Sequence, residues 1–389
     1  MDQHTLESAQ SFLSENNISG WLLYDYLKSN PIFHKLLTTT GHVTRPVYLL
    51  IKPNTQPSLI VHHVDISKFI NENLDIKPYS NRINMITQLE ENLKDMQILA
   101  MEYSKSGQLP RISRVDAGTI ELISELGPKV ISSADLVQFT TQTWTDSELD
   151  SHIEAGRLLG IIVNDAFKFI GTNLNNNLTE YDVANYIRDL FVANNLVTND
   201  GPVVAANENS ADPHYEPELR SHTLKSGDWI LIDLWAKLNN AQSIYADITW
   251  VAYIGNSVPE NYQHIFNIVV EARNKSLEFL KSKFANNEKV QGWEVDDIAR
   301  DTIQQYGYLN NFTHRLGHSI GYEVHSEGVN LDNWETHDTR EIIKGIGFSI
   351  EPGIYISSQF GMRSEIDVYI SDEGPVASSP VQNQIVLIR

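Results

Sequence analysis

The chain has 389 residues, 41 % hydrophobic and 20 % charged, which is typical of a water-soluble globular protein long enough for two domains. Its 29 basic and 50 acidic residues give a net charge of −21, which repels phosphate backbones and argues against nucleic-acid binding. The absence of cysteine excludes disulfides, thiolate metal sites and cysteine nucleophiles. We find no signal peptide and no apolar run of about 18 residues, so we expect a cytoplasmic protein that does not span a membrane.

Residues 1–143 predict a small α/β domain. Short apolar runs bounded by turn residues predict strands at 20–26, 45–53, 57–65 and 97–103. Residues 116–127 predict a helix, which Gly127-Pro128 ends. His62 and His63 fall within the third strand, where neighbouring side chains point to opposite faces. We therefore expect structural roles for this pair rather than a shared metal ion.

Residues 144–389 predict a second domain that begins with two helices. Thr145–Glu148 and Thr179–Asp182 are capping boxes, and they predict helices that run to about 170 and about 194. A loop-rich segment follows. Two apolar strands are then predicted at 228–237 and 243–254.

The same order of elements then recurs. The second copy has predicted helices at 259–283, with Pro259 at the first helical position, and 293–306, a loop-rich segment, and strands at 345–356 and 362–370. The repeat predicts an α+β domain with pseudo-two-fold symmetry.

Among the acids in or beside these apolar strands, four stand in matching places of the two halves: Asp233, Asp247, Glu351 and Glu365. An unpaired ionised carboxylate is very costly to bury. The only basic residues in the same strands are Lys237 and Arg363. The four acids in matching places therefore predict bound cations.

The spacing of the acids predicts that they converge. Asp233 and Asp247 are 14 residues apart, centred on Asn240, and a hairpin turn there would put them opposite each other with Cβ atoms about 5 Å apart. Glu351 and Glu365 are also 14 apart, centred on Ser358. If the pseudo-symmetry brings the hairpins together, four negative charges balance two divalent cations. Manganese, cobalt, zinc or iron suits such a site with one or two imidazoles, whereas calcium prefers carbonyl-rich loops.

The segment 312–328 allows two interpretations. Gly317-His318-Ser319-Ile320-Gly321 satisfies G-x-S-x-G, but a serine nucleophile needs a following helix, then an acid and a histidine. A crowded pair such as Asp332 and His337 would have to supply that order. The residues after Gly321 predict extended structure instead. We therefore favour the histidines of this segment and of the corresponding segment of the first half, as metal ligand, oxyanion stabilisers and proton-transfer groups: His314, His318, His325 and His214.

These residues resemble a known family. Asp233 in LIDLW, Asp247 in YADITW, His318 in HRLGHSIGYEVH, Glu351 in IEPGIYI and Glu365 in RSEIDV are similar to the five-ligand signature of the pita-bread metallopeptidases, peptidase family M24. The presence of an N-terminal domain points within that family to the Xaa-Pro dipeptidase (prolidase) and aminopeptidase P branch. Residues 1–143 resemble its creatinase-like N-terminal domain more loosely.

The resemblance implies a site with two divalent metal ions, manganese first, with cobalt or zinc as alternatives. Asp247 and Glu365 would bridge both ions, Asp233 would bind one, and His318 and Glu351 the other. The resemblance also implies that Glu351 is the general base for a metal-bridging water. The remaining roles it implies are stabilisation of the tetrahedral intermediate and handling of the leaving proline nitrogen by His214 and His325, and substrate contact by His314 and Arg363.

The implied activity is hydrolysis of the amide bond before proline, in dipeptides or longer peptides, by a homodimer. Alternatives are a creatinase-like hydrolase of a small C–N compound without metal, and an inactive peptide-binding protein of the same fold. The sequence departs from the family pattern at Leu234-Trp235, where small residues are usual, and in a first hairpin about three residues longer. These departures put the pocket shape and the residue preferred before proline in question.

Overall fold

The computed structural model describes residues 3–69, 73–213, 215–217 and 221–389. The chain divides into two compact units, Met1–Thr141 (unit 1) and Gln142–Arg389 (unit 2). Across the described residues, no helix combines the length and the apolar character that crossing a membrane requires.

Unit 1 is a six-stranded mixed sheet in the order β4-β3-β2-β1-β5-β6. Its strands are β1 Gly20–Asp25, β2 Val47–Ile51, β3 Ser58–His62, β4 Asp75–Tyr79, β5 Ile98–Met101 and β6 Lys129–Ser132. The four predicted strands are present. The two that sequence reasoning missed, β4 and β6, are edge strands with little buried surface, so their sequences carry no strong apolar pattern.

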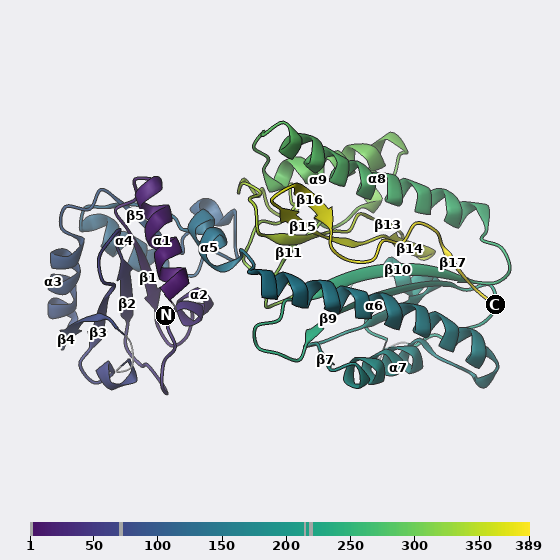
Figure 1. Cartoon of the computed structure of the whole chain (residues 1–389), viewed down its shortest axis with the longest axis horizontal. Helices are drawn as coiled ribbons and strands as arrows, with labels where there is room; N and C mark the ends of the chain where they lie inside the picture. The colour runs from purple at the N-terminus through teal and green to yellow at the C-terminus, as the bar shows by residue number, and fades with distance from the viewer. Residues whose placement is uncertain (1–2, 70–72, 214, 218–220) are drawn as a thin grey trace. The chain divides into compact units, whose positions relative to one another are not determined.

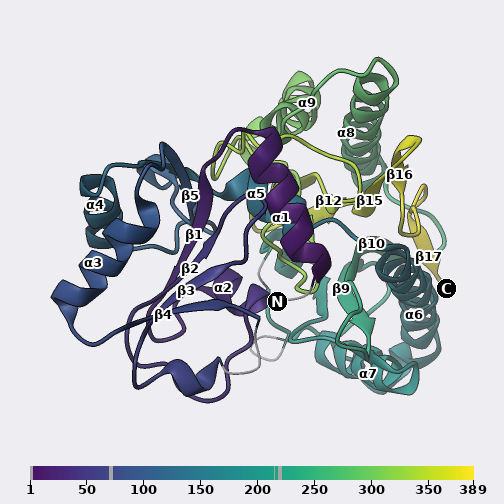
Figure 2. The ribbon, with the colours of Figure 1, turned by 60° about the vertical axis from the view of Figure 1, so that its left-hand side comes forward.

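In the described part of unit 1, five α-helices cover both faces of this sheet: α1 Gln3–Glu15, α2 Pro31–Leu36, α3 Arg82–Leu93, α4 Ala117–Glu125 and α5 Ala134–Thr141. Figure 2 shows α1 and α5 on one side of the sheet and α3 and α4 on the other. The predicted helix is α4, and Asp116 caps it by accepting a hydrogen bond from Thr119 N (2.9 Å).

The expectation that His62 and His63 point to opposite faces was wrong. Their ring centroids lie 4.4 Å apart, because β3 ends at His62 and His63 belongs to the following turn. His62 Nε2 lies 3.1 Å from Ser80 O. Neither imidazole belongs to a potential metal-binding group in the described part of the chain.

Unit 1 also contains a buried acid, Glu102, directly after β5. Its carboxylate accepts hydrogen bonds from Trp21 Nε1 (2.6 Å), Asn30 Nδ2 (2.8 Å) and Ser133 Oγ (3.0 Å). Burial nevertheless raises the pKa of Glu102 from 4.5 to about 7, because the hydrogen bonds offset only part of the desolvation.

Unit 2 begins with the first of two similar halves. It contains α6 Asp146–Asn173, α7 Glu180–Ala193, β7 Leu196–Val197, β8 Val203–Ala206, the 3₁₀ helix η4 Asn207–Ala211, β9 Trp229–Leu238 and β10 Ala246–Ile254. Both predicted capping boxes are confirmed, at Thr145 for α6 and Thr179 for α7.

The second half repeats this order. It contains α8 Glu260–Ala285, α9 Gly292–Gln305, β11 Ser319–Ile320, β12 Gly347–Ile350, β13 Gly353–Ile356, β14 Phe360–Arg363, β15 Ile366–Ser371, β16 Gly374–Ala377 and β17 Val386–Ile388. Pro259 is the N-cap residue of α8 and not, as predicted, its first helical residue.

The two halves form a layered structure with the helices outside. Figure 1 shows α6 and α7 on one side of the central strands, and α8 and α9 on the other. Even-numbered residues of β9 and β10, such as Ile232 and Ile248, pack into the core with α6 and α7. Even-numbered residues of β12 and β15, such as Phe348 and Val368, pack into the core with α8 and α9. The odd-numbered residues therefore make the inner faces of both hairpins.

The predicted register of the first hairpin was wrong by two residues. Asp233 pairs with Thr249, and Asp247 pairs with Trp235. A seven-residue connection, Asn239–Tyr245, replaces the predicted three-residue turn around Asn240. Because side chains alternate with a period of two, a shift of two residues leaves both aspartates on the same face.

The second hairpin has the predicted centre but is interrupted. Gly353 pairs with Arg363 on one side of the break, and Ile350 pairs with Ile366 on the other. Both pairings are centred on Ser358, so Glu351 and Glu365 face each other at the break. The predicted long strands are thus two short pairs with the acids between them.

Gly361 in β14 links the two halves of unit 2. Its N–H donates to Ser210 Oγ (2.8 Å) in η4, and its carbonyl accepts from Trp229 Nε1 (2.8 Å) in β9. A Cβ at this position would lie 1.8 Å from the Ser210 carbonyl oxygen. No side chain fits there unless the two halves separate.

Gly361→Ala should therefore lower the free energy of unfolding of unit 2 by about 3 kcal/mol, the cost of overpacking a tight contact. Gly156→Ala is the matched control, because its Cβ would meet Ser379 at 3.5 Å, an ordinary contact, in the middle of α6. That change should raise stability by about 0.5–1 kcal/mol. Urea unfolding followed by fluorescence checks both, and equal effects of the two substitutions would contradict this account.

The stability of unit 1 should fall as the pH rises from about 4.5 to about 7. The folded-state pKa of Glu102 lies above its unfolded-state value, so its stabilising contribution is fully present below pH 4.5 and is lost as the pH rises through about 7. In Glu102→Gln this slope, at most about 1.4 kcal/mol per pH unit, should disappear. Hydrogen exchange of the β5 amides across this range measures it, and an unchanged slope in the variant would refute the assignment.

Candidate metal centre

The inner faces of the two hairpins meet through polar contacts. Thr249 Oγ1 in β10 donates to Glu365 Oε2 (2.6 Å), beside β15. Asp247 N donates to Asp367 Oδ2 (2.9 Å) in β15. The pseudo-symmetric halves therefore place their acidic pairs against each other, as the repeat predicted.

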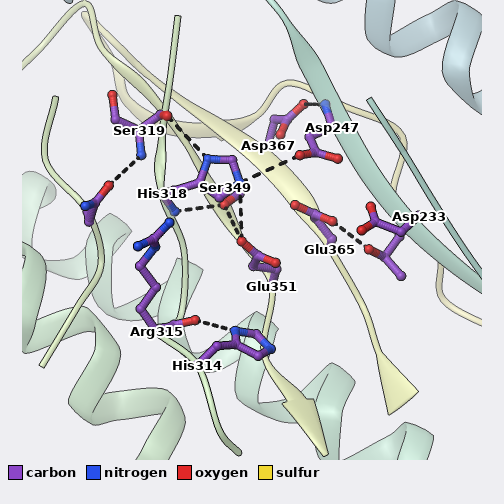
Figure 3. Close-up of polar contacts among 12 residues, drawn as sticks. Asp233, Asp247, His314, Arg315, His318, Ser319, Ser349, Glu351, Glu365 and Asp367 are labelled. Carbon is purple, nitrogen blue, oxygen red and sulfur yellow. Dashed lines mark hydrogen bonds and ion pairs between the residues drawn. The ribbon is translucent and has the colours of Figure 1, made fainter. Parts of the chain in front are cut away.

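The structure brings the five predicted metal ligands together (Figure 3). Asp247, His318 and Glu365 each offer a ligand atom, and these atoms all lie within 4.8 Å of one another. His318 Nε2 is 3.4 Å from Glu351 Oε1 and 3.7 Å from Asp247 Oδ2. The charges of Glu351 and Asp233 both act on Glu365, which places those two acids in the same group.

Burial and mutual repulsion shift the protonation of this group. Burial, then the charge of Glu365, raises the pKa of Asp247 well above its ordinary value, and burial, then Glu351 and Asp233, does the same for Glu365. Burial also raises the pKa of Glu351 to about 7. Burial, then the neighbouring His325, holds the pKa of His318 well below its usual value, which leaves the neutral imidazole that ligates metals.

The residues present fit a bound cation. Asp233 Oδ1, Asp247 Oδ1 and Glu365 Oε1 are buried and have no hydrogen-bond partner anywhere in the described residues. Buried polar atoms are normally satisfied, so three orphaned carboxylate oxygens in one group are suited to bind a cation. Carboxylates with one imidazole are the donors that manganese, cobalt and zinc accept.

Arg363 and His314, the predicted substrate contacts, meet at one hydroxyl. Arg363 forms an ion pair with Asp233, and its Nη1 donates to Tyr355 Oη (3.1 Å). His314 Nδ1 lies 2.7 Å from Arg315 O and so carries the proton, and its Nε2 accepts from Tyr355 Oη (2.8 Å). Burial, then the charge of Arg363, lowers the pKa of His314 to about 3 and keeps it neutral.

Of the two histidines with predicted catalytic roles, one lies within the described residues. The His325 ring lies edge-on to the His318 ring with centroids 4.3 Å apart, and His325 lines the same cavity as the ligands. His214 lies outside the described residues, so its predicted role stays a prediction. Its neighbour Tyr215 lines that cavity and donates through Oη to the buried Glu180 Oε2 (2.6 Å).

Ser319 does not form a nucleophile elbow. It lies in β11, which pairs with β12, and no helix follows it. Its buried Oγ accepts a hydrogen bond from Gly328 N (3.1 Å). Asp332 accepts bonds from the backbone of Trp334 to Thr336, so the alternative catalytic triad is not assembled.

The ligand group opens into a cavity of about 1130 Å³. One part of the wall is acidic and carries the predicted ligands. Another part is apolar and comes from α7, β7, β8 and the loop between these strands, with Phe191, Val192, Leu196, Val197 and Pro202. The cavity is large enough for a peptide and combines a reactive polar group with apolar walls.

Three residues that sequence reasoning missed hold this site together. Thr249 connects Glu365 to Arg363, since its hydroxyl donates to the first and accepts Nε of the second (2.8 Å). Tyr355 connects His314 to Arg363, and Asp367 fixes the backbone of Asp247. Only Asp367 left a usable signal, because it lies two residues after Glu365 and so on the same face of the strand.

Comparison with known proteins gives a family match. The model of metallopeptidase family M24 matches residues 154–372, more than half of the chain. The Xaa-Pro dipeptidase of Pyrococcus furiosus is 32 % identical over 184 residues, 47 % of this chain and 48 % of that protein. An uncharacterized peptidase of Staphylococcus saprophyticus is 28 % identical over 346 residues, 86 % of this chain and 89 % of that protein. The chain spans about half the length, or less, of the first curated relatives it matches.

Solved structures show the same architecture. The dipeptidase PepE from Mycobacterium ulcerans superposes with a TM-score of 0.74 at 19 % identity, covering 99 % of this chain and 97 % of that one. The X-Pro aminopeptidase from Thermotoga maritima gives a TM-score of 0.63 at 23 % identity, covering 98 % and 99 %. These likenesses confirm the predicted pita-bread fold class.

His318→Ala should weaken binding of Mn²⁺ by at least about 100-fold, because it removes an imidazole that lies 3.7 Å from Asp247 and 3.4 Å from Glu351. Ser319→Ala, at the next residue, should keep the metal and cost about 1 kcal/mol of stability through the lost Gly328 contact. Metal analysis after dialysis, with titration calorimetry, measures both. Equal metal retention by the two variants would show that His318 is not a ligand.

Proposed function

Because the chain belongs to metallopeptidase family M24, we propose that it is a metal-dependent peptidase that hydrolyses the amide bond before proline. The observation that supports this most directly is the group of Asp233, Asp247, His318, Glu351 and Glu365, which line one cavity and three of whose carboxylates have an orphaned buried oxygen. The Xaa-Pro dipeptidases among its relatives support proline-containing substrates.

The five residues of this group would hold two divalent ions, with manganese, cobalt or zinc as candidates. When bound, such ions supply a hydroxide nucleophile at neutral pH and polarise the scissile carbonyl. Glu351, whose pKa burial raises to about 7, is suited to accept and return a proton near neutral pH. His325, edge-on to His318 in the same cavity, would stabilise the developing oxyanion, and His214 is proposed to share this task.

Arg363 and His314 would orient the substrate through the hydroxyl of Tyr355. The guanidinium is held by Asp233, Thr249 and Tyr355, so it is fixed before substrate arrives. A fixed cation beside the acidic group suits a carbonyl or carboxylate oxygen of a peptide. The division into a creatinase-like domain of residues 1–143 and a catalytic domain of 144–389, a cytoplasmic location and a homodimer complete the proposal.

Asp247→Ala should lower kcat/KM for Xaa-Pro peptides by at least about 1000-fold, because a buried group that organises the reaction centre is removed. The assay compares Xaa-Pro dipeptides with Xaa-Pro-Xaa tripeptides in Mn²⁺, Co²⁺ and Zn²⁺, which also separates dipeptidase from aminopeptidase activity. Stoichiometric metal without cleavage of any peptide would favour the inactive peptide-binding alternative. Hydrolysis of a small C–N compound by the metal-free protein would favour the creatinase-like one.

A further inference from the structure

Trp235 stands beside the predicted metal ligands. It lies two residues after Asp233 on the same face of β9, and it is directly opposite Asp247 in the β9–β10 register. Opposite residues in such a pair have Cβ atoms about 5 Å apart. The indole is half-buried and lines the cavity that also contains the ligands. Its position therefore puts an aromatic surface next to the reaction centre.

The indole is held in one orientation. Its Nε1 donates to Asp200 Oδ1 (2.9 Å). The ring lies against Gly201, where an added Cβ would come within 2.7 Å of indole Cζ2 and Cη2. Gly201 has a φ of +75°, so glycine suits both the backbone and the close approach of the ring. The indole also packs against the apolar cluster of Trp144, Ile244, Tyr245 and Ile320.

Val324 adds a second apolar surface near the same ligands. It immediately precedes His325, packs against that same apolar cluster and lines the same cavity. Trp235 and Val324 thus give an apolar wall to the part of the cavity that carries Asp247 and His325. An apolar substrate side chain gains roughly 25 cal/mol for each Å² buried on such a wall, whereas a glycine gains almost nothing.

We propose that Trp235 is a specificity-determining residue, whose indole, with Val324, binds the side chain of the residue before the scissile bond and selects large apolar residues there. This rests on the proposed function, in which the residue after the bond is always proline. The residue before the bond is then the variable one, and a fixed wall can discriminate only among side chains that vary. A rigid indole also suits this role because little side-chain freedom is lost when the substrate binds.

The test measures kcat/KM of the metal-loaded full chain for Leu-Pro, Phe-Pro, Gly-Pro and Asp-Pro. In Trp235→Ala the preference for Leu-Pro over Gly-Pro should fall about tenfold, mainly through KM for Leu-Pro. Trp235→Phe keeps an aromatic wall without the bond to Asp200 and should keep most of the preference. Calorimetric binding of reduced-amide analogues of Leu-Pro and Gly-Pro should show the same change without turnover.

Trp250→Ala is the matched control. Trp250 lies on the face of β10 opposite to that of Asp247, is half-buried and packs against the core with α6 and α7. This substitution should lower stability and leave the Leu-Pro to Gly-Pro ratio unchanged.

Two outcomes would overturn the proposal. An equal loss for all four substrates in Trp235→Ala would mean that the indole packs against the proline or only supports the fold, while the proposed function would stand. Absence of cleavage of every Xaa-Pro peptide by the unsubstituted protein would instead refute the proposed function, and this proposal with it.

Discussion

Two acidic β-hairpins face each other in unit 2. Their carboxylates repel one another, and the surrounding helices and hydrogen bonds must hold them together against this repulsion. Side-chain alternation lets one strand serve two purposes: Ile232 and Leu234 pack outward into an apolar core, while Asp233 between them points inward. The helix pairs on the outside bury the apolar faces and so hold the acids together. The hydrogen bonds from Thr249 to Glu365 and from the Asp247 backbone to Asp367 offset part of the free-energy cost of burying these carboxylates. Bound cations would offset the rest at the three orphaned oxygens.

Much of this arrangement could be predicted, because its determinants are local. Capping boxes set the starts of α6 and α7, and the period of two places the acids on one face. The register of the first hairpin, by contrast, is not determined by the local sequence. The seven-residue connection between β9 and β10 replaces a tight turn, and nothing within Asn239–Tyr245 indicates where pairing resumes. The predicted convergence of the acids does not depend on the exact register, because an even shift preserves the face.

The polar residues that organise the site were harder to predict for a physical reason. Tyr355 and Thr249 are unremarkable in their own strands, and their importance arises only where β10, β13 and β14 come together around Arg363. A hydroxyl that donates to one partner and accepts from another can join an imidazole or a carboxylate to a guanidinium. The bonds of Thr249 join residues 116 and 114 positions apart in the chain, and the bond of Tyr355 to His314 spans 41 positions, which periodicity within one strand does not report.

If the two proposals hold, the same geometry ties substrate selection to metal binding. Asp233 and Trp235 are two residues apart on β9, so any change in twist or register that moves the ligand also moves the indole. A loop-borne wall could vary independently of the reaction centre, whereas a strand-borne wall keeps a constant position relative to Asp247. The glycine at 201 leaves room for a bulky side chain where small residues are usual. In the proposed function, selectivity could therefore differ from that of relatives while all five proposed ligands stay in place.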